Sequence, residues 1–390
     1  MRTVAFTPPV SKEWLGGINY YRNLCSAIVR YERENIQIKI FLPYGQKKSI
    51  FDEFPPEIEV QETLLLTRWS VPWVLRKLWS KCFGNDDMLA WYLRRQKVDV
   101  ISHQQSPARC MGLQNIGWIP DFQHKYLPDF FTKKEIEGRN LGFLRLAKKM
   151  DRVILSSQTA KDDFIKYYPQ YAGKARVLRF VPAIDFSARG TRDEVKKKYA
   201  LPEKFFFLPN QYWVHKNHKI VLEALRILKQ QGKFVGVVST GNTKDYRDPG
   251  YFATLEEFIE KHDLKDRYMI LGMVPYADVQ SLSEAAWAYI NPSLFEGWST
   301  TVEEAKYRGK PILLSNLKVH REQAPKKGVY FNPMDPDELA EKMWNMWNRE
   351  PMKEEEVRAL ERTHQKAMKA FAETYDAILE EGQKRNSLVE

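Results

Sequence analysis

Cysteine is scarce in this sequence of 390 residues, which contains only Cys25, Cys82 and Cys110. The three lie far apart and show no Cys/His spacing of a zinc site, which argues against a disulfide scaffold or a zinc domain. Apolar runs are short, because none approaches the roughly 18 residues of a membrane-spanning helix. The first residues lack the apolar stretch of a signal peptide. We therefore expect a protein of the reducing cytoplasm that crosses no bilayer.

Acidic residues are outnumbered, and the imbalance lies in one half of the chain. Residues 1–184 hold 29 Lys and Arg against 18 Asp and Glu, whereas residues 185–390 hold 32 against 32. The basic half predicts an anionic surface or acceptor as partner, and the neutral half a smaller or more neutral ligand. Nucleic acid is not expected, because no zinc finger, RNP-like strand or base-reading basic helix occurs.

The length exceeds what one hydrophobic core usually organises, so two domains are expected. Short β-branched or aromatic runs alternate with helical patterns such as 218–231 and 276–286, a rhythm typical of a doubly wound parallel sheet. The expected strands are 4–6, 36–42, 98–102, 117–119, 153–156 and 176–180 in the first half, and 205–208, 234–238, 268–271, 288–291 and 311–315 in the second.

The most informative stretch is the segment 291–311. A predicted strand ends at its start, a short loop carries Glu296, and a helix containing Glu304 follows. Open α/β sheets bind ligands where the carboxyl end of a strand meets a helix N-terminus, whose N–H groups suit phosphate or sugar oxygens. The two carboxylates would accept hydrogen bonds from sugar hydroxyls. Alternatively, one glutamate only closes a capping box, since Thr300 and Thr301 each stand three residues before a glutamate.

This stretch, which reads Pro-Ser-Leu-Phe-Glu-Gly-Trp-Ser-Thr-Thr-Val-Glu-Glu-Ala from Pro292, resembles the retaining glycosyltransferases of family four, or group 1. In that family two glutamates separated by seven residues follow a Pro-Ser-aromatic stretch. The resemblance implies an α/β GT-B fold, in which two Rossmann-like doubly wound domains face a central cleft. Residues 1–184 would bind the acceptor and residues 185–372 the sugar nucleotide, while the last helix, 373–390, would return to the first domain.

The resemblance also assigns roles to residues of this segment. Glu296 would hold hydroxyls of the transferred sugar, and Glu304 would hold the ribose. The backbone around the start of the helix would bind the sugar and the phosphates, through Gly297, Trp298, Ser299, Thr300 and Thr301.

A second polar stretch follows the first predicted strand of the second domain. Its Lys216 can neutralise a diphosphate. In the family an arginine usually stands five residues earlier and shares this task, but here Gln211 takes that place. His215, Asn210 or a group from the basic half would then supply the missing contact. Asn217 fits both an N-cap and a ligand role.

Two places in the first half are candidates for the same ligands. Gly16 and Gly17 follow the first strand, where they would let the backbone approach a diphosphate as the family's glycine loop does. Any tight strand-to-helix turn could use them equally well. Asp121 and His124 follow a later strand and offer a carboxylate and an imidazole to the donor sugar or the acceptor hydroxyl.

The family's histidine cannot be carried over to this chain. Relatives often place it directly before the aspartate, and here that place is Pro120. His124 either replaces it or is a loop histidine satisfied by its neighbours. His103, at the end of another strand, is a weaker candidate for the same cleft.

No metal site is expected, and no other cofactor. The only Asp-x-Asp string, Asp335-Pro-Asp337, is interpreted as an N-cap followed by the first turn of a helix.

Residues 71–83 have helical periodicity with an apolar face and a basic face. They form either a helix that contacts an anionic membrane or a surface helix packed on its own domain. The apolar face comprises Val71, Val74, Leu75, Leu78, Trp79, Cys82 and Phe83, and the opposite face comprises Arg76, Lys77 and Lys81.

The sequence thus predicts a retaining, metal-independent hexosyltransferase of the cytoplasm, peripheral on the inner face of the membrane through its basic half. The donor would be a nucleotide sugar and the acceptor a glycan or a lipid-linked molecule, in surface polysaccharide or glycoconjugate biosynthesis. Two alternatives stay open. A sugar-nucleotide epimerase shares the architecture, and a non-catalytic sugar-nucleotide or membrane-binding protein is favoured by Gln211 and Pro120.

Overall fold

The computed structural model describes residues 1–9, 15–46, 54–350 and 357–386. The chain forms two compact units. The first consists of residues 1–183 with 366–390, and the second of residues 184–365.

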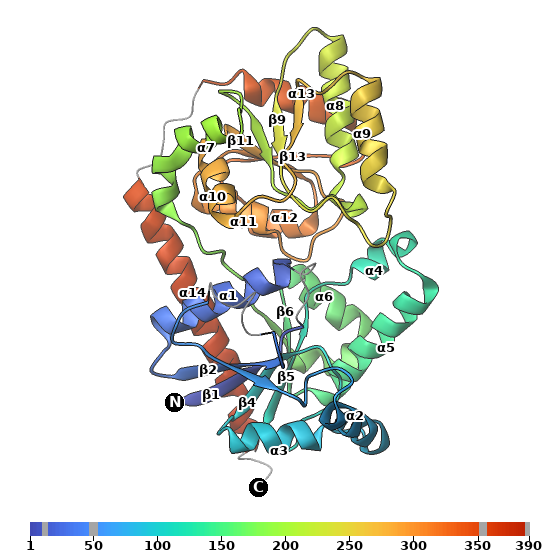
Figure 1. The fold of residues 1–390 in the computed structure, drawn as a ribbon, viewed down its shortest axis with the longest axis vertical. Helices are drawn as coiled ribbons and strands as arrows, with labels where there is room; N and C mark the ends of the chain where they lie inside the picture. Colours follow the sequence, from blue (N-terminus) through green and yellow to red (C-terminus); the bar gives the residue numbers. More distant parts are fainter. Residues whose placement is uncertain (10–14, 47–53, 351–356, 387–390) are drawn as a thin grey trace. The chain divides into compact units, whose positions relative to one another are not determined.

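The first unit is built on a parallel sheet whose strands, within the described residues, follow the order β3-β2-β1-β4-β5-β6-β7. The chain moves outward from β1 to β3 and then returns to pair β4 with β1, so the sheet is wound in both directions from this pair. Its elements, most of which are labelled in Figure 1, are β1 (Arg2–Phe6), α1 (Leu15–Tyr31), β2 (Ile36–Pro43), β3 (Glu59–Thr63), α2 (Val71–Phe83), α3 (Asp87–Arg95), β4 (Val100–Gln104), β5 (Gln114–Ile119), α4 (Gln123–Tyr126), α5 (Lys133–Lys149), β6 (Arg152–Leu155), α6 (Gln158–Tyr167) and β7 (Ala175–Val177).

The second unit repeats this winding, with the described strands in the order β10-β9-β8-β11-β12-β13, all parallel. Its elements are α7 (Arg192–Lys198), β8 (Phe206–Leu208), α8 (His218–Gln230), β9 (Val237–Ser239), α9 (Tyr251–Lys261), β10 (Tyr268–Ile270), α10 (Tyr276–Ala285), β11 (Ala288–Asn291), α11 (Thr300–Tyr307), β12 (Ile312–Ser315), α12 (Lys318–Gln323), β13 (Gly328–Phe331), α13 (Pro336–Trp347) and the start of α14 (Val357–Asn386).

The aromatic run at β8 shows how the sequence covers both faces of this sheet. Phe206 and Leu208 belong to a core with residues of α8, α9 and α13. Phe205 and Phe207 belong to a second core with residues of α7, α10 and α11. Successive side chains of a strand point to opposite faces, so an uninterrupted apolar run is what a sheet with helices on both sides requires.

The sequence predicts neither β3 nor β13, and it places the start of β9 too early. Both missed strands lie at an edge of their sheet, where half-buried residues replace the apolar run of a central strand. The strand β9 begins at Val237 rather than at Phe234, because Phe234 is 45% exposed and lies outside the core.

The last helix, α14, contributes to both units (Figure 1). The division falls between residues 365 and 366, earlier than the sequence-based boundary after residue 372. Leu360 is buried in the part of the helix that belongs to the second unit, and Met368 and Phe371 are buried in the part that belongs to the first. Arg2 forms an ion pair with Asp376 at 3.2 Å. Arg152 Nη2 donates a hydrogen bond to the Glu381 carbonyl at 2.9 Å. These contacts attach the second part of α14 to β1 and β6.

Helix α2 turns its apolar face to solvent and its buried face carries a charge. Leu75 and Leu78 are 52% and 56% exposed, and Phe83 is 62% exposed. On the opposite side Arg76 is buried against Asp86, with Nε 2.9 Å from both carboxylate oxygens. The prediction that Arg76 belongs to a solvated basic face is therefore wrong, because the carboxylate at the start of α3 holds it inside the unit.

A buried charge cluster joins the helices on one face of the second sheet. Glu284 of α10 accepts hydrogen bonds from Arg308, from Arg189 at 3.1 Å and from Arg192 at 3.2 Å. Both Glu284 and Arg308 are fully buried. Removing one partner of a buried ion pair leaves an uncompensated charge, so this cluster makes the packing of α7, α10 and α11 depend on one carboxylate.

Glu284→Gln is therefore expected to lower the free energy of unfolding of the second unit by about 3 to 5 kcal/mol. The control is Glu260→Gln, whose ion pair with Lys265 is 68% exposed on both sides and should contribute no more than about 1 kcal/mol. Urea denaturation followed by intrinsic fluorescence measures both values. Equal denaturation midpoints for the two variants would contradict the role of the cluster.

Candidate functional site

The strand order of the second unit fixes where a ligand site can form. β8 and β11 pair at the centre of the sheet, and the connections that leave them run in opposite directions. Residues 209–217 follow β8, and residues 292–299 follow β11. Open α/β sheets bind ligands at the carboxyl edge where the winding direction reverses. The two polar stretches singled out from the sequence therefore emerge side by side at this edge.

An ion pair joins the two loops. Lys216 Nζ lies 2.7 Å from Glu296 Oε1, and the Ser293 hydroxyl lies 2.7 Å from the same oxygen. The side chains of Lys216 and Glu296 are 16% and 9% exposed. A cation for anionic groups and a carboxylate for hydroxyls thus stand together at the edge, each partly accessible.

Asn291, the last residue of β11, connects this pair to the start of α11. Its Oδ1 lies 2.7 Å from the Ser293 hydroxyl, and its Nδ2 donates to the Ser299 hydroxyl at 2.6 Å. Ser293 has a single hydroxyl proton, so Glu296 and Asn291 share it. Asn210 extends the network from the other loop, because it accepts a hydrogen bond from Thr301 Oγ1 at 3.2 Å.

The start of α11 differs from the capping box that the sequence allows. Ser299 is the N-cap and accepts a hydrogen bond from the backbone of Val302, so the third helical position is a valine and no glutamate closes a box. Gln323 braces the cap from α12, because its side chain contacts the Ser299 N–H at 3.3 Å and the Ser299 carbonyl at 2.9 Å. The cap is therefore held rigidly, and Glu304 takes no part in it.

The two adjacent glutamates of α11 point to different surroundings. Glu303 accepts a hydrogen bond from Gln323 Nε2 at 2.9 Å, and its burial raises the pKa of the carboxyl. Glu304 lies in the second turn, is 6% exposed and interacts electrostatically with Tyr289 and Arg308. Glu303 is thus part of the packing between α11 and α12.

Asn217 and Gln211 bond to neighbouring loops through their side chains. Asn217 occupies the N-cap position of α8 without capping it, because its side chain donates to the carbonyls of Pro292 and Pro333 at 3.2 and 2.8 Å. It therefore ties the loops together. Gln211 Oε1 accepts a hydrogen bond from the Asn242 N–H at 2.8 Å. Just before α11, Gly297 and Trp298 are half-buried, and Thr300, its first residue, is exposed.

Residues 191–366, which include both loops, match the family model described as glycosyl transferases group 1. These residues belong to the glycosyl transferases group 1 family. We refer to them as the group 1 domain.

The relatives of the whole chain are distant. An O-antigen chain mannosyltransferase of Salmonella typhimurium is 25% identical over 227 residues, which are 58% of this chain and 57% of that protein. One component of the phosphatidylinositol N-acetylglucosaminyltransferase of Arabidopsis thaliana is 24% identical over 284 residues, which are 69% of this chain and 59% of that protein. The chain thus spans little more than half the length of these curated relatives.

Solved structures resemble the chain over nearly its full length. HepE from Anabaena, in complex with UDP and glucose, covers 100% of this chain and 99% of its own, with a TM-score of 0.66 and 16% identity. This likeness is one of fold, and it identifies the two parallel-sheet units as the GT-B fold.

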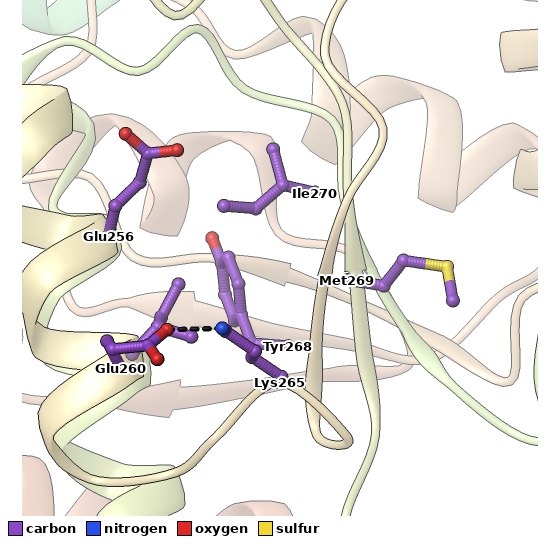
Figure 2. A pocket seen from close by; sticks show the side chains of 7 residues that line it. Glu256, Glu260, Lys265, Tyr268, Met269 and Ile270 are labelled. Carbon is purple, nitrogen blue, oxygen red and sulfur yellow. Dashed lines mark ion pairs between the residues drawn. The ribbon is translucent and has the colours of Figure 1, made fainter.

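A pocket of the group 1 domain is lined by residues of the segment 256–270. Figure 2 shows it at the outer strand β10 and helix α9, where Lys265 is paired with Glu260. It contains none of the residues predicted for the site, because it is lined by Glu256, Ile259, Glu260, Lys265, Tyr268, Met269 and Ile270.

No cluster of three His, Cys, Asp or Glu side chains that could hold a metal ion occurs in the described residues. Asp335 is the N-cap of α13, with its carboxylate accepting a hydrogen bond from the Glu338 N–H at 2.9 Å, and Pro336 is the first residue of the helix. This Asp-x-Asp string has the capping role that the sequence indicates.

Four of the predicted residues belong to the first unit: Gly16, Gly17, Asp121 and His124. Gly16 and Gly17 lie in the first turn of α1, after a segment outside the described residues. Apart from its chain neighbours and the backbone of its own helix, none of the described residues lies within 4 Å of a Cβ added at Gly16. Asp121 follows β5 and accepts a hydrogen bond from the Gln123 N–H at 2.9 Å. Its carboxylate therefore turns the chain into the short helix α4.

The two histidines of the first unit are buried. His124 is 1% exposed, with Nε2 2.9 Å from Asn140 Oδ1 and its ring 5.5 Å from that of Phe143. Burial lowers its pKa. His103 is 2% exposed and contacts the Tyr20 hydroxyl at 2.7 Å. His103 thus belongs to the interior, and His124 has the surroundings of a packed loop histidine.

Several residues that build the edge of the group 1 domain are not predicted from the sequence. Ser293 and Asn291 lie within the motif around Glu296, and a serine and an asparagine at a strand end are natural hydrogen-bond partners for a loop carboxylate. Gln323 lies on another helix, and no spacing connects it to Ser299. Arg247 lies in the loop after β9, in the polar stretch 240–250.

His103 is expected to make stability depend on pH. Burial lowers its pKa from 6.5 to about 3, so below pH 6.5 the unfolded chain binds a proton that the folded chain excludes. Stability is therefore lost as the pH falls from about 6.5 to 3, by up to roughly 1.4 kcal/mol per pH unit. His103→Gln should remove this part of the slope between pH 6 and pH 4, measured by urea denaturation. An unchanged slope would show that the imidazole accepts its proton in the folded protein.

Proposed function

We propose that this protein is a retaining glycosyltransferase that moves a hexose-type sugar from a nucleotide sugar to a glycan or lipid-linked acceptor. The observation that carries the proposal is the Lys216–Glu296 pair at the point where the winding of the group 1 domain reverses. It places a cation for phosphates beside a carboxylate for hydroxyls. Two relatives, a mannosyltransferase and one component of an N-acetylglucosaminyltransferase, support the same reaction class.

The donor would be held by groups that already stand in order. Glu296 would accept hydrogen bonds from hydroxyls of the transferred sugar, while Ser293 and Asn291 fix its carboxylate. Glu304 would bind the ribose. Lys216 and the N–H groups at the start of α11 would face the diphosphate, since a helix N-terminus favours anions. The solved structure of HepE with UDP and glucose agrees with a ligand of this kind.

The reaction would proceed on one face of the sugar. The bond between the anomeric carbon and the departing phosphate oxygen breaks while the acceptor oxygen forms the new bond from the same side, and the leaving diphosphate takes the acceptor's proton. Lys216 and the α11 N-terminus would stabilise the charge that develops on the diphosphate. We infer that these groups act in place of a metal ion. Surface polysaccharide synthesis is the role that the O-antigen relative suggests.

Glu296→Gln is expected to weaken binding of the nucleotide sugar about tenfold or more, because a hydrogen bond to a charged group contributes roughly 1.5 to 3 kcal/mol. Lys216→Ala should weaken the binding of the sugar nucleotide and the binding of the free nucleoside diphosphate by similar factors. Calorimetric titration of UDP, GDP and ADP sugars in EDTA measures both effects. The matched control is Lys265→Ala in the pocket of Figure 2, which should bind like the wild type.

The outcomes of this titration separate the alternatives. No binding of any sugar nucleotide would overturn the proposal. Binding followed by conversion of the donor sugar without an acceptor would identify an epimerase, and binding without any turnover would identify the non-catalytic protein that Gln211 and Pro120 favour. A loss of binding in EDTA that Mg²⁺ restores would contradict metal independence.

We further propose that the basic first unit docks on an anionic membrane through α2, on the cytoplasmic face. The exposed stripe of this helix includes Leu75, Leu78 and Trp79, and Lys77 and Lys81 flank it on the exposed surface. Apolar side chains enter the headgroup region while lysines contact anionic lipids. Among the helices in the described part of the chain, none has the length and apolar character needed to cross a bilayer.

Leu75→Glu with Leu78→Glu should lower binding to phosphatidylglycerol vesicles at least tenfold, because each leucine contributes roughly 1.5 kcal/mol or more when buried. The control pair is Leu141→Glu with Leu144→Glu, which changes exposed leucines of α5. Co-sedimentation with vesicles measures binding. Equal binding of both double variants, or a stripe that mediates self-association in the absence of lipid, would contradict membrane docking.

A further inference from the structure

The loop that follows β9, residues 240–250, is attached along its length to the loop that follows β8. The Tyr212 N–H donates to the Asn242 carbonyl at 3.0 Å, and the Asn242 N–H donates back to Gln211 Oε1 at 2.8 Å. Further along, the Val214 N–H donates to the Asp245 carboxylate at 3.2 Å. These bonds make the conformation of residues 240–250 depend on residues 211–214.

The approach of the two loops requires glycine at position 241. Gly241 has a φ of +146°, and a Cβ there would lie 2.4 Å from the Asn210 carbonyl oxygen. Its N–H donates to the Gly272 carbonyl at 2.9 Å. A side chain at this position would separate the loops, so the sequence contains the residue that the close packing needs.

This packing brings Arg247 to the residue beside Lys216. The Asp245 carboxylate accepts hydrogen bonds from the Arg247 N–H at 3.0 Å and from its Nε at 3.3 Å. Arg247 Nη2 lies 3.1 Å from His215 Nδ1, and the guanidinium lies over the Trp213 ring at 5.3 Å. The arginine is therefore oriented on three sides, with its side chain 10% exposed.

His215 connects this arginine to the site. It is 5% exposed, and burial lowers its pKa well below the usual value, with the charges of Lys216 and Arg247 acting in the same direction. The neutral ring can then accept a hydrogen bond from the guanidinium. The His215 carbonyl accepts from the Leu294 N–H at 2.8 Å. The same residue therefore contacts Arg247 and the loop that carries Glu296.

The negative charge of a diphosphate exceeds the positive charge that Lys216 alone supplies to the site. Lys216 is paired with Glu296 and Arg247 with Asp245, so each cation would meet a diphosphate with its charge partly shared, and the two together would supply more positive charge than the lysine alone. Gln211 contributes no charge, and its side-chain oxygen is engaged by the loop of Arg247. A guanidinium offers several N–H donors in a fixed plane, which suits phosphate oxygens better than an amide does.

We propose that Arg247 binds the donor diphosphate beside Lys216, and that Gln211 holds the loop which delivers it. This inference rests on the proposed function. Arg247 would thus supply, from the loop after the neighbouring strand, the positive charge that the uncharged Gln211 does not provide.

The test compares nucleoside diphosphates with nucleosides. Arg247→Ala should weaken binding of whichever of UDP, GDP and ADP the wild type binds by about tenfold to a hundredfold, with a smaller loss for Arg247→Lys. Binding of the matching nucleoside should not change, because it has no phosphate. Arg226→Ala, which changes an arginine on α8 that contacts Gln230, is the control and should bind like the wild type.

The results distinguish failure of this inference from failure of the proposed function. A wild type that binds none of the three diphosphates would overturn the function itself. A wild type that binds one of them, with the same affinity in Arg247→Ala, would overturn only the role of Arg247. An equal loss of nucleoside and diphosphate binding would also overturn it, because Arg247 would then support only the loop.

Discussion

The pairing of β8 with β11 is the constraint on which the rest of the second unit depends. Phe206 and Phe207 of one strand are in register with Ala288 and Tyr289 of the other. Because the chain leaves these strands toward opposite halves of the sheet, the loops that follow them begin side by side at the carboxyl edge and then run apart. Residues far apart in sequence can meet there, as Lys216 and Glu296 do.

The polar network at this edge is preorganised before any ligand arrives. Asn291 connects Ser293 with the cap of α11, and Gln323 supports that cap from the next helix. A buried polar network is stable only when its members are satisfied, and its rigidity then fixes the direction of the carboxylate it holds. Glu296 would thus need little reorganisation to accept a ligand hydroxyl.

The sequence predicts the parts of this site that depend on local patterns. The strand 288–291, the helix after Glu296 and the cap at Asp335 follow from apolar runs and capping residues, and the structure has all three. The remaining features depend on contacts between distant segments. No spacing relates Gly241 to Asn210, so the loop that carries Arg247 could not be assigned to the site, and edge strands such as β13 lack the apolar run that identifies central strands.

Helix α2 shows why periodicity alone does not give orientation. The sequence predicts which residues share a face, yet a rotation of the helix decides whether that face packs or is exposed. Here a bidentate contact between Arg76 and Asp86 fixes the rotation and leaves Leu75, Leu78 and Phe83 outside. In water this arrangement forgoes the stabilisation of burying three large apolar side chains. The same arrangement would become favourable if a lipid surface covered the stripe, because the charged pair would then stay inside the protein, away from the hydrocarbon.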